Sequence, residues 1–297
     1  MLKITRRRSP RPPVASALSR LMEQYLAANR ALWDEWTAIH EHSSFYDVEG
    51  FKRGGIRVRE YELAELGEVN GKDLLHLQCH FGLDTLSFAR LGAHPTGADF
   101  SADAISLARS LADELELRAD FICSDLYSLP AALPRDFDIV YTSRGVLGWL
   151  PDIWAWAKVV RHFLRPGGVF YITEKHPFAD VFDDDIPFKV NYDYFGGKEP
   201  HRFETQGSYA DPEAHIEQPY EYGWWHPLSN IISALTSQGL RIDFLHEWPF
   251  CEWELAGLDL NPEDGTWRQP GGEPRLPLFF SLRATKPEGS SQAANIV

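Results

Sequence analysis

The stretch LLHLQCHFGLDT, residues 74–85, decides the fold of this chain. It begins as an apolar run, breaks at Gly82, and continues with apolar residues spaced by three or four. This pattern predicts a strand, a tight turn and a helix. In α/β proteins ligands bind at such junctions, because the free N–H groups and the positive end of the helix dipole lie there.

The region after this stretch alternates between predicted strands and helices. Strands are predicted at residues 74–79, 94–99, 120–124, 137–141 and 169–173, with helical segments between them. This alternation predicts an α/β fold with a Rossmann-like, doubly wound, mostly parallel sheet. Two late strands, at residues 240–247 and 276–285, are separated by a Pro/Gly-rich loop at residues 261–274, which favours an antiparallel pair at the sheet edge.

The domain organisation follows from shifts in composition. Residues 1–18 contain several Arg and Pro and no acidic residue, which predicts a disordered basic tail, and a second disordered tail is predicted at 287–297. The domain between them, residues 19–286, is expected to carry an N-terminal helical cap at 19–70. An aromatic-rich insertion of short antiparallel strands and loops is expected at 177–226.

Composition and charge exclude several classes of partner. The 297 residues carry a formal net charge of −14, which disfavours nucleic acid, because that binding depends on Lys and Arg. The three Cys form no CxxC pair, so no disulfide framework or metal site is predicted, and a cytoplasmic location is expected. No apolar run is long enough to cross a membrane. We expect a small-molecule substrate and a monomer or homodimer.

Four elements in order resemble the class I methyltransferases that use S-adenosylmethionine, in particular an uncharacterised bacterial subgroup of the type 11/12-like enzymes. The resemblance covers residues 74–173 and the late strand pair. The elements are the turn at Gly82; Asp99 at the end of the second strand; Ser124-Asp125-Leu126 after the third; and the fourth strand at residues 137–140, followed by Leu164-Arg165-Pro166-Gly167-Gly168.

This resemblance implies a binding site for S-adenosylmethionine, with S-adenosylhomocysteine as the product. Asp99 would accept the ribose hydroxyls, and Phe100 would pack on the adenine face. Asp125 would accept from the adenine amino group, and the Leu126 N–H would face a ring nitrogen. The other cofactor contacts expected are Tyr46, Gln78, His80, Gly82, Ser143 and Gly145.

The first motif departs from the family pattern of an acid followed by Gly-x-Gly-x-Gly. His76 stands at the position of the acid, and Gln78 and His80 stand at the first two glycines. Two interpretations remain open. Either the Gln78 and His80 side chains contribute hydrogen bonds of their own, or they replace glycine on a backbone that tolerates them.

The substrate is expected above the carboxyl ends of the strands. Two aromatic segments fit this place, namely residues 33–46 and the aromatic insertion, which ends in residues 222–228. They predict a small aromatic or hydrophobic acceptor, or a cation held by aromatic faces. His176 and His226 are the candidate general bases, because His titrates near neutral pH.

Three alternatives are weighed against the small-molecule enzyme. A nicotinamide-dependent oxidoreductase would need Gly-x-Gly-x-x-Gly after the first strand, which is absent. For a protein or RNA methyltransferase, the acidic charge argues against an RNA substrate, and no Asn-Pro-Pro-Tyr-type motif follows the fourth strand, where the sequence reads Tyr141-Thr142-Ser143-Arg144. The altered first motif leaves a non-catalytic, methyltransferase-like ligand-binding protein as the remaining alternative.

Overall fold

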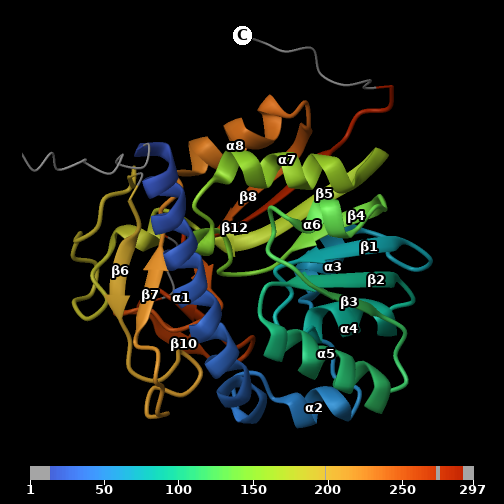
Figure 1. Ribbon diagram of the computed structural model, residues 1–297. Coiled ribbons are helices and arrows are strands. Elements are labelled where there is room, and N and C mark those ends of the chain that lie inside the picture. Colours follow the sequence, from blue (N-terminus) through green and yellow to red (C-terminus); the bar gives the residue numbers. More distant parts are fainter. Residues whose placement is uncertain (1–13, 198, 272–274, 290–297) are drawn as a thin grey trace, which may run out of the picture.

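The computed structural model describes residues 14–197, 199–271 and 275–289, and its centre is a seven-stranded sheet (Figure 1). The strand order is β3-β2-β1-β4-β5-β12-β8. The strands are β1 (Asp73–Leu77), β2 (His94–Asp99), β3 (Asp120–Cys123), β4 (Phe137–Thr142), β5 (Leu164–Lys175), β8 (Arg241–Trp248) and β12 (Phe279–Thr285). The first five are parallel, and β12 is antiparallel to both β5 and β8. The predicted Rossmann-like sheet with its antiparallel edge pair is confirmed.

The register of the parallel strands brings their carboxyl ends to one edge. Leu77 of β1 lies opposite Ala98 of β2 and Thr142 of β4, and Asp99 lies opposite Cys123 of β3. The loops that follow these strands therefore meet at one place. This edge is where α/β sheets bind ligands.

Helices cover both faces of the sheet (Figure 1). One face packs against α6 (Leu129–Ala132), α7 (Ile153–Phe163) and α8 (Leu228–Ser237), and Trp156 is fully buried in that core. The other face packs against α3 (Glu60–Leu66), α4 (Leu83–Arg90) and α5 (Ala102–Glu114). The Asp152 carboxylate caps α7, and the Ser101 hydroxyl caps α5, so local sequence fixes where both helices begin.

The remaining elements are added at the ligand-binding edge. They are α1 (Val14–His42), α2 (Val48–Lys52), the hairpin of β6 (His201–Glu204) and β7 (Tyr220–Gly223), the single turns Leu147–Trp149 and Ala179–Val181, and the sheet of β9 (Phe250–Cys251), β10 (Asp259–Asn261) and β11 (Thr266–Arg268). The long helix α1 runs beside β7 (Figure 1). The Asn29 amide joins them, donating to Tyr222 O and accepting from Tyr222 N, both at 2.8 Å.

Three local predictions differ from the structure. The segment 261–274 is predicted as a loop, but β11 lies within it, because Trp267 pairs with Leu260 of β10 in a short hairpin and with Cys251 of β9 on its other side. The turn at residues 164–168 is absorbed into β5. Helix α1 already begins at Val14, whereas residues 1–13 and 290–297 of the predicted tails lie outside the described residues. Across the described part of the chain, no helix is long and apolar enough to span a membrane.

Gly82 is the glycine on which the first turn depends. Its φ is +78°, and a Cβ there would lie 2.6 Å from Cε1 of Phe121. Gly239 has a similar φ of +74° but open space around it. We expect Gly239→Ala to lower the free energy of unfolding by about 1 kcal/mol through backbone strain alone. Gly82→Ala should cost roughly 1–3 kcal/mol more because of the added overlap.

Urea denaturation of the two variants measures this difference. Equal losses at both positions would contradict the close packing of Gly82 against Phe121.

Candidate active site

A cavity of about 640 Å³ lies at the carboxyl edge of the sheet. Its volume is in the usual range for small-ligand sites. All the expected cofactor contacts line it, namely Tyr46, Gln78, His80, Gly82, Asp99, Phe100, Asp125, Leu126, Ser143 and Gly145. The cavity also continues past Ser143 to Arg144, Glu252 and Trp253.

The loop after β1 keeps a glycine-like backbone although two of its glycines are replaced. Gln78 has φ +56° and His80 has φ +51°, in the left-handed region that costs a side-chain-bearing residue of order 1 kcal/mol. The side chains help to hold this conformation. Gln78 Nε2 donates to Val146 O at 3.0 Å, and His80 Nε2 lies 2.9 Å from His40 Nδ1 of α1. Gln78 and His80 thus take the backbone conformation of the glycines they replace, and their side chains also form hydrogen bonds. These hydrogen bonds are made to groups of the protein itself.

Asp99 joins the loops after β1 and β2. One carboxylate oxygen accepts from His80 N at 2.8 Å, and the other accepts from Ser101 N at 2.9 Å. Burial raises the pKa of Asp99 to about 6, against the effect of these N–H donors. Each oxygen has a second lone-pair site, so the carboxylate can also accept from hydroxyl groups in the cavity.

The loop after β3 brings a carboxylate to the cavity. Asp125 Oδ1 accepts from Tyr127 N and Ser128 N, both at 3.0 Å, and this fixes the turn. Asp99 and Asp125 share the cavity lining with four apolar residues from several loops, which we call the apolar slot: Phe100, Leu126, Leu129 and Leu150. Two carboxylates together with apolar side chains fit an adenosine group. The residues present therefore suit the cofactor that the resemblance implies.

Glu174 holds the loop that follows β4. This buried carboxylate accepts from Gly145 N at 2.6 Å, Val146 N at 2.8 Å and Leu147 N at 3.1 Å. The Ser143 hydroxyl at the start of the loop lies 3.0 Å from His76 Nε2. The cavity wall between β1 and β4 is thus fixed by side chains from the ends of β1 and β5.

Aromatic rings form the wall of the cavity opposite the sheet. The Trp33 ring of α1 lies 5.0 Å from the His80 ring and 5.3 Å from the Trp149 ring, between ring centroids. The Tyr46 hydroxyl forms a hydrogen bond with the Tyr209 hydroxyl of the insertion. The N-terminal cap and the insertion therefore meet at the cavity through Tyr46 and Tyr209, whereas no residue of 222–228 is in the described cavity lining.

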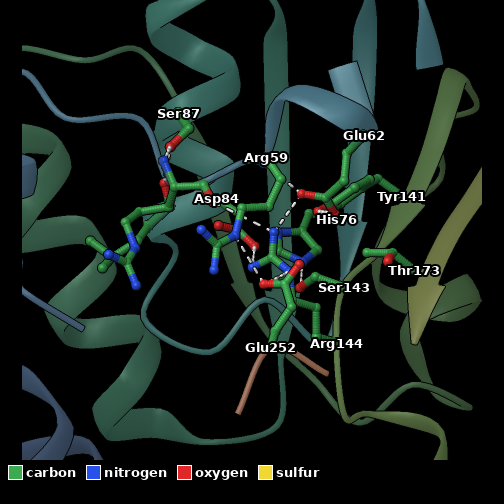
Figure 2. Close-up of polar contacts among 12 residues, drawn as sticks. Arg59, Glu62, His76, Asp84, Ser87, Tyr141, Ser143, Arg144, Thr173 and Glu252 are labelled. Atoms are coloured by element: carbon green, nitrogen blue, oxygen red, sulfur yellow. Dashed lines mark hydrogen bonds and ion pairs between the residues drawn. The ribbon is translucent and has the colours of Figure 1, made fainter. Parts of the chain in front are cut away.

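A cluster of charged groups lies at the other end (Figure 2). Arg144 contacts three carboxylates: it donates to Glu62, its Nε lies 3.1 Å from Glu252 Oε2, and its Nη1 lies 3.4 Å from Asp84 Oδ2. Arg59 Nε also donates to Glu252 Oε2 at 3.1 Å. Burial alone would lower the pKa of Arg144, but the carboxylates of Glu252, Glu62 and Asp84 together raise it. Arg144 therefore stays charged and paired.

Neither predicted general base is among the described residues that line the cavity. His176 Nε2 lies 3.0 Å from Glu247 Oε1, and its Nδ1 accepts from Phe178 N at 3.0 Å. The backbone N–H of His176 donates to Leu278 O at 3.0 Å, just before β12 begins. This hydrogen bond holds His176 beside the strand next to β5. His226 Nε2 donates to Leu150 O at 2.7 Å, ahead of α7. Both histidines form hydrogen bonds within the protein and lie outside the described cavity lining, so neither is placed to act as a general base there.

The sequence interpretation missed the charged end of the cavity. Arg144 directly follows Ser143 in the loop after β4, and this position alone would have predicted that Arg144 lies at the cavity. Glu252, Trp253 and Trp267 reach the cavity from the β9–β11 sheet, far away in the chain. No local pattern links that sheet to the edge of the central one.

Comparison with known proteins agrees with this geometry. Residues 74–168 match the family model described as "Methyltransferase domain". A ubiquinone biosynthesis O-methyltransferase of Serratia proteamaculans (strain 568) is 31% identical over 136 residues. That match covers 44% of this chain and 56% of the relative, so the chain spans about half the length of the relatives it matches.

Solved structures share the fold over a longer part of the chain. A putative S-adenosylmethionine dependent methyltransferase from Listeria monocytogenes has a TM-score of 0.53 at 22% identity, covering 77% of this chain and 96% of that one. A S-adenosylmethionine dependent methyltransferase from Mesorhizobium loti has a TM-score of 0.54 at 21% identity, covering 76% and 95%. The protein therefore has the fold of the class I methyltransferases, and residues 74–168 match the methyltransferase-domain model. Both solved structures are described as S-adenosylmethionine dependent.

Glu174 gives a test of how the cavity wall is held. We expect Glu174→Gln to lower the free energy of unfolding by about 1–3 kcal/mol, because one amide group cannot accept the same set of N–H donors. Thermal unfolding measures the change. Glu254→Gln serves as the control, since Glu254 is exposed and lies outside the described cavity lining. Equal melting temperatures for the two variants would contradict this role of Glu174.

Proposed function

We propose that this protein is an S-adenosylmethionine-dependent methyltransferase that acts on a small aromatic or hydrophobic molecule. One observation carries the proposal. A single cavity joins the end formed by Asp99, Asp125 and the apolar slot to an end lined by aromatic and charged side chains. The first end suits adenosine, and the second end leaves space for an acceptor.

The proposed mechanism relies on placement. When bound, S-adenosylmethionine supplies a methyl group activated by its sulfonium. Asp99 would hold the ribose hydroxyls, and Asp125 would accept from the adenine amino group. The loop fixed by Glu174 would keep Ser143 and Gly145 against the reacting end, and the rings of Trp33, Trp149 and Tyr209 would exclude water. Alignment in a dry, shaped site can supply much of the acceleration of such a displacement.

No histidine is assigned as a base in this proposal. His76 and His80 line the cavity, but burial lowers the pKa of His76 to about 4 and that of His80 well below its usual value. Both ring nitrogens of His76 are hydrogen-bonded, to Thr85 and Ser143. His80 Nε2 is hydrogen-bonded to His40, whereas its Nδ1 is buried and has no hydrogen-bond partner among the described residues. An acceptor that ionises easily, such as a phenolic hydroxyl, would need little help. The O-methyltransferase name of the Serratia relative is consistent with such an acceptor.

A non-catalytic, methyltransferase-like ligand-binding protein is the second candidate. The strained backbone at Gln78 and His80 favours it, because the family places flexible glycines there. Turnover separates the two candidates. The enzyme should release S-adenosylhomocysteine when supplied with S-adenosylmethionine and a panel of small phenols and aromatic amines, whereas a binding protein should not.

Calorimetric titration tests the cofactor directly. We expect S-adenosylmethionine and S-adenosylhomocysteine both to bind, and Asp99→Ala to weaken each by about 10- to 100-fold through loss of a charged acceptor. Glu49→Ala is the control, because Glu49 is an exposed acid on α2 outside the described cavity lining. Absence of binding to the wild type at high micromolar ligand would contradict the proposal.

The pKa of Asp99 adds a pH dependence. Because burial raises this pKa to about 6, the ionised form that accepts from hydroxyls is lost as the pH falls through that value. The affinity for S-adenosylhomocysteine should be constant above about pH 7 and fall below about pH 6, approaching tenfold per pH unit. Asp99→Asn should bind more weakly and lack this fall. Parallel pH profiles for wild type and Asp99→Asn would remove the ribose assignment.

A further inference from the structure

Glu252 is the carboxylate that enters the described cavity lining from outside residues 74–168. The other carboxylates of that lining belong to the matched domain, namely Asp84, Asp99 and Asp125. Glu252 directly follows β9, and its side chain is only 5% exposed. The added β9–β11 sheet therefore places a buried acid at the cavity, which the common fold does not supply.

Protein contacts fix the Glu252 carboxylate and still leave it able to accept a further hydrogen bond. Oε2 accepts from Arg59 Nε at 3.1 Å and lies 3.1 Å from Arg144 Nε (Figure 2). Oε1 accepts from the Tyr61 hydroxyl at 2.7 Å, which is its one donor among the described residues. A carboxylate oxygen has two lone-pair sites, so Oε1 keeps one for a donor on a ligand in the cavity.

The next residue supplies a flat apolar surface beside this carboxylate. Trp253 lines the cavity, and a Cβ on Gly145 would lie 3.5 Å from its ring atom Cη2. An edge-on contact with Phe279, at 5.5 Å between ring centroids, holds the Trp253 ring. Glu252 in turn contacts Arg144, the neighbour of Gly145. Both residues therefore contact the loop after β4, where the proposed function places the reacting end of the cofactor.

The partners of Glu252 favour a neutral donor on the ligand. Arg59 and Arg144 already place two guanidinium groups against the carboxylate. A neutral group adds a hydrogen bond there without adding a third positive charge. Among neutral donors, a hydroxyl group forms the shortest and strongest hydrogen bonds to a carboxylate. A flat ring that carries a hydroxyl group matches both Trp253 and Glu252.

We propose that Glu252 accepts a hydrogen bond, and then the proton, from a hydroxyl group of the acceptor, whose ring packs on Trp253. The inference rests on the proposed function and extends it by naming the acceptor group and the residue that takes its proton.

The proposed step balances at the hydroxyl oxygen. This oxygen forms a bond to the methyl carbon while the carbon–sulfur bond of the cofactor breaks and its electron pair stays on sulfur. The hydroxyl proton passes to Glu252 Oε1 and from there to water. Because the O–H group becomes more acidic as its oxygen gains the methyl group, a carboxylate is able to take the proton at that stage.

The test uses two phenols of similar size that differ in acidity. In mildly alkaline buffer para-cresol keeps its proton, whereas para-nitrophenol is already ionised. The variant is Glu252→Gln. Glu62→Gln is the matched control, because Glu62 is a buried partner of Arg144 that lies outside the described cavity lining. Release of S-adenosylhomocysteine measures turnover, and calorimetry with each phenol on protein saturated with S-adenosylhomocysteine measures binding.

We expect Glu252→Gln to lower kcat for para-cresol by about 100-fold or more and to weaken its binding by about 10-fold. Turnover and binding of para-nitrophenol should change little, because its ionised form has no proton to give up. Any loss in Glu62→Gln should be the same for both phenols. S-adenosylhomocysteine should bind equally to the wild type and to both variants.

Two results with Glu252→Gln would overturn the proposal. These are an equal loss with the two phenols and no loss with para-cresol, and each would leave Glu252 as a counter-ion of the arginines. A wild type that binds S-adenosylhomocysteine but methylates neither phenol would overturn it as well. If Glu252→Gln does not bind S-adenosylhomocysteine, Glu252→Asp replaces it. That variant keeps the charge but draws the carboxylate back, and the same comparison of the two phenols decides the outcome.

Failure of the wild type to bind S-adenosylhomocysteine is a separate result. It contradicts the proposed function and, with it, the role of Glu252.

Discussion

The hydrogen bond from His80 N–H to the Asp99 carboxylate is the contact on which the cavity depends. It joins the turn after β1 to the end of β2, and the second oxygen of the same carboxylate fixes Ser101 at the start of α5. His80 needs such a partner, because its left-handed backbone is unfavourable for a residue with a side chain. One buried acid therefore holds a strained turn and presents its remaining lone pairs to the cavity.

A second buried carboxylate holds a loop in the same way between β4 and β5. Glu174 at the end of β5 gathers the N–H groups of the loop after β4, and Gln78 Nε2 donates to a carbonyl of that loop. Buried carboxylates that satisfy backbone donors cost desolvation and restrict the loops they bind. The result is a cavity wall made of loops that are fixed before any ligand arrives, which is what alignment-based catalysis requires.

Charge is distributed unevenly along the cavity. Asp99 and Asp125 supply carboxylate acceptors after β2 and β3, whereas Arg144, after β4, is balanced by three carboxylates. The charge of Arg144 is therefore neutralised within the protein, whose formal net charge is −14.

The sequence by itself determined the mostly parallel sheet and the meeting of three residues at its carboxyl edge, where they line one cavity. Gly82, Asp99 and Asp125 follow β1, β2 and β3 directly, and parallel strands bring such residues together whatever else the chain does. Only the tertiary structure decided the rest. Trp267 and Glu252 reach the cavity through the pairing of β11 with β9. His176 and His226 looked suitable by position, but long-range partners turn them away from the cavity. These features depend on contacts between distant segments, which local periodicity and spacing do not encode.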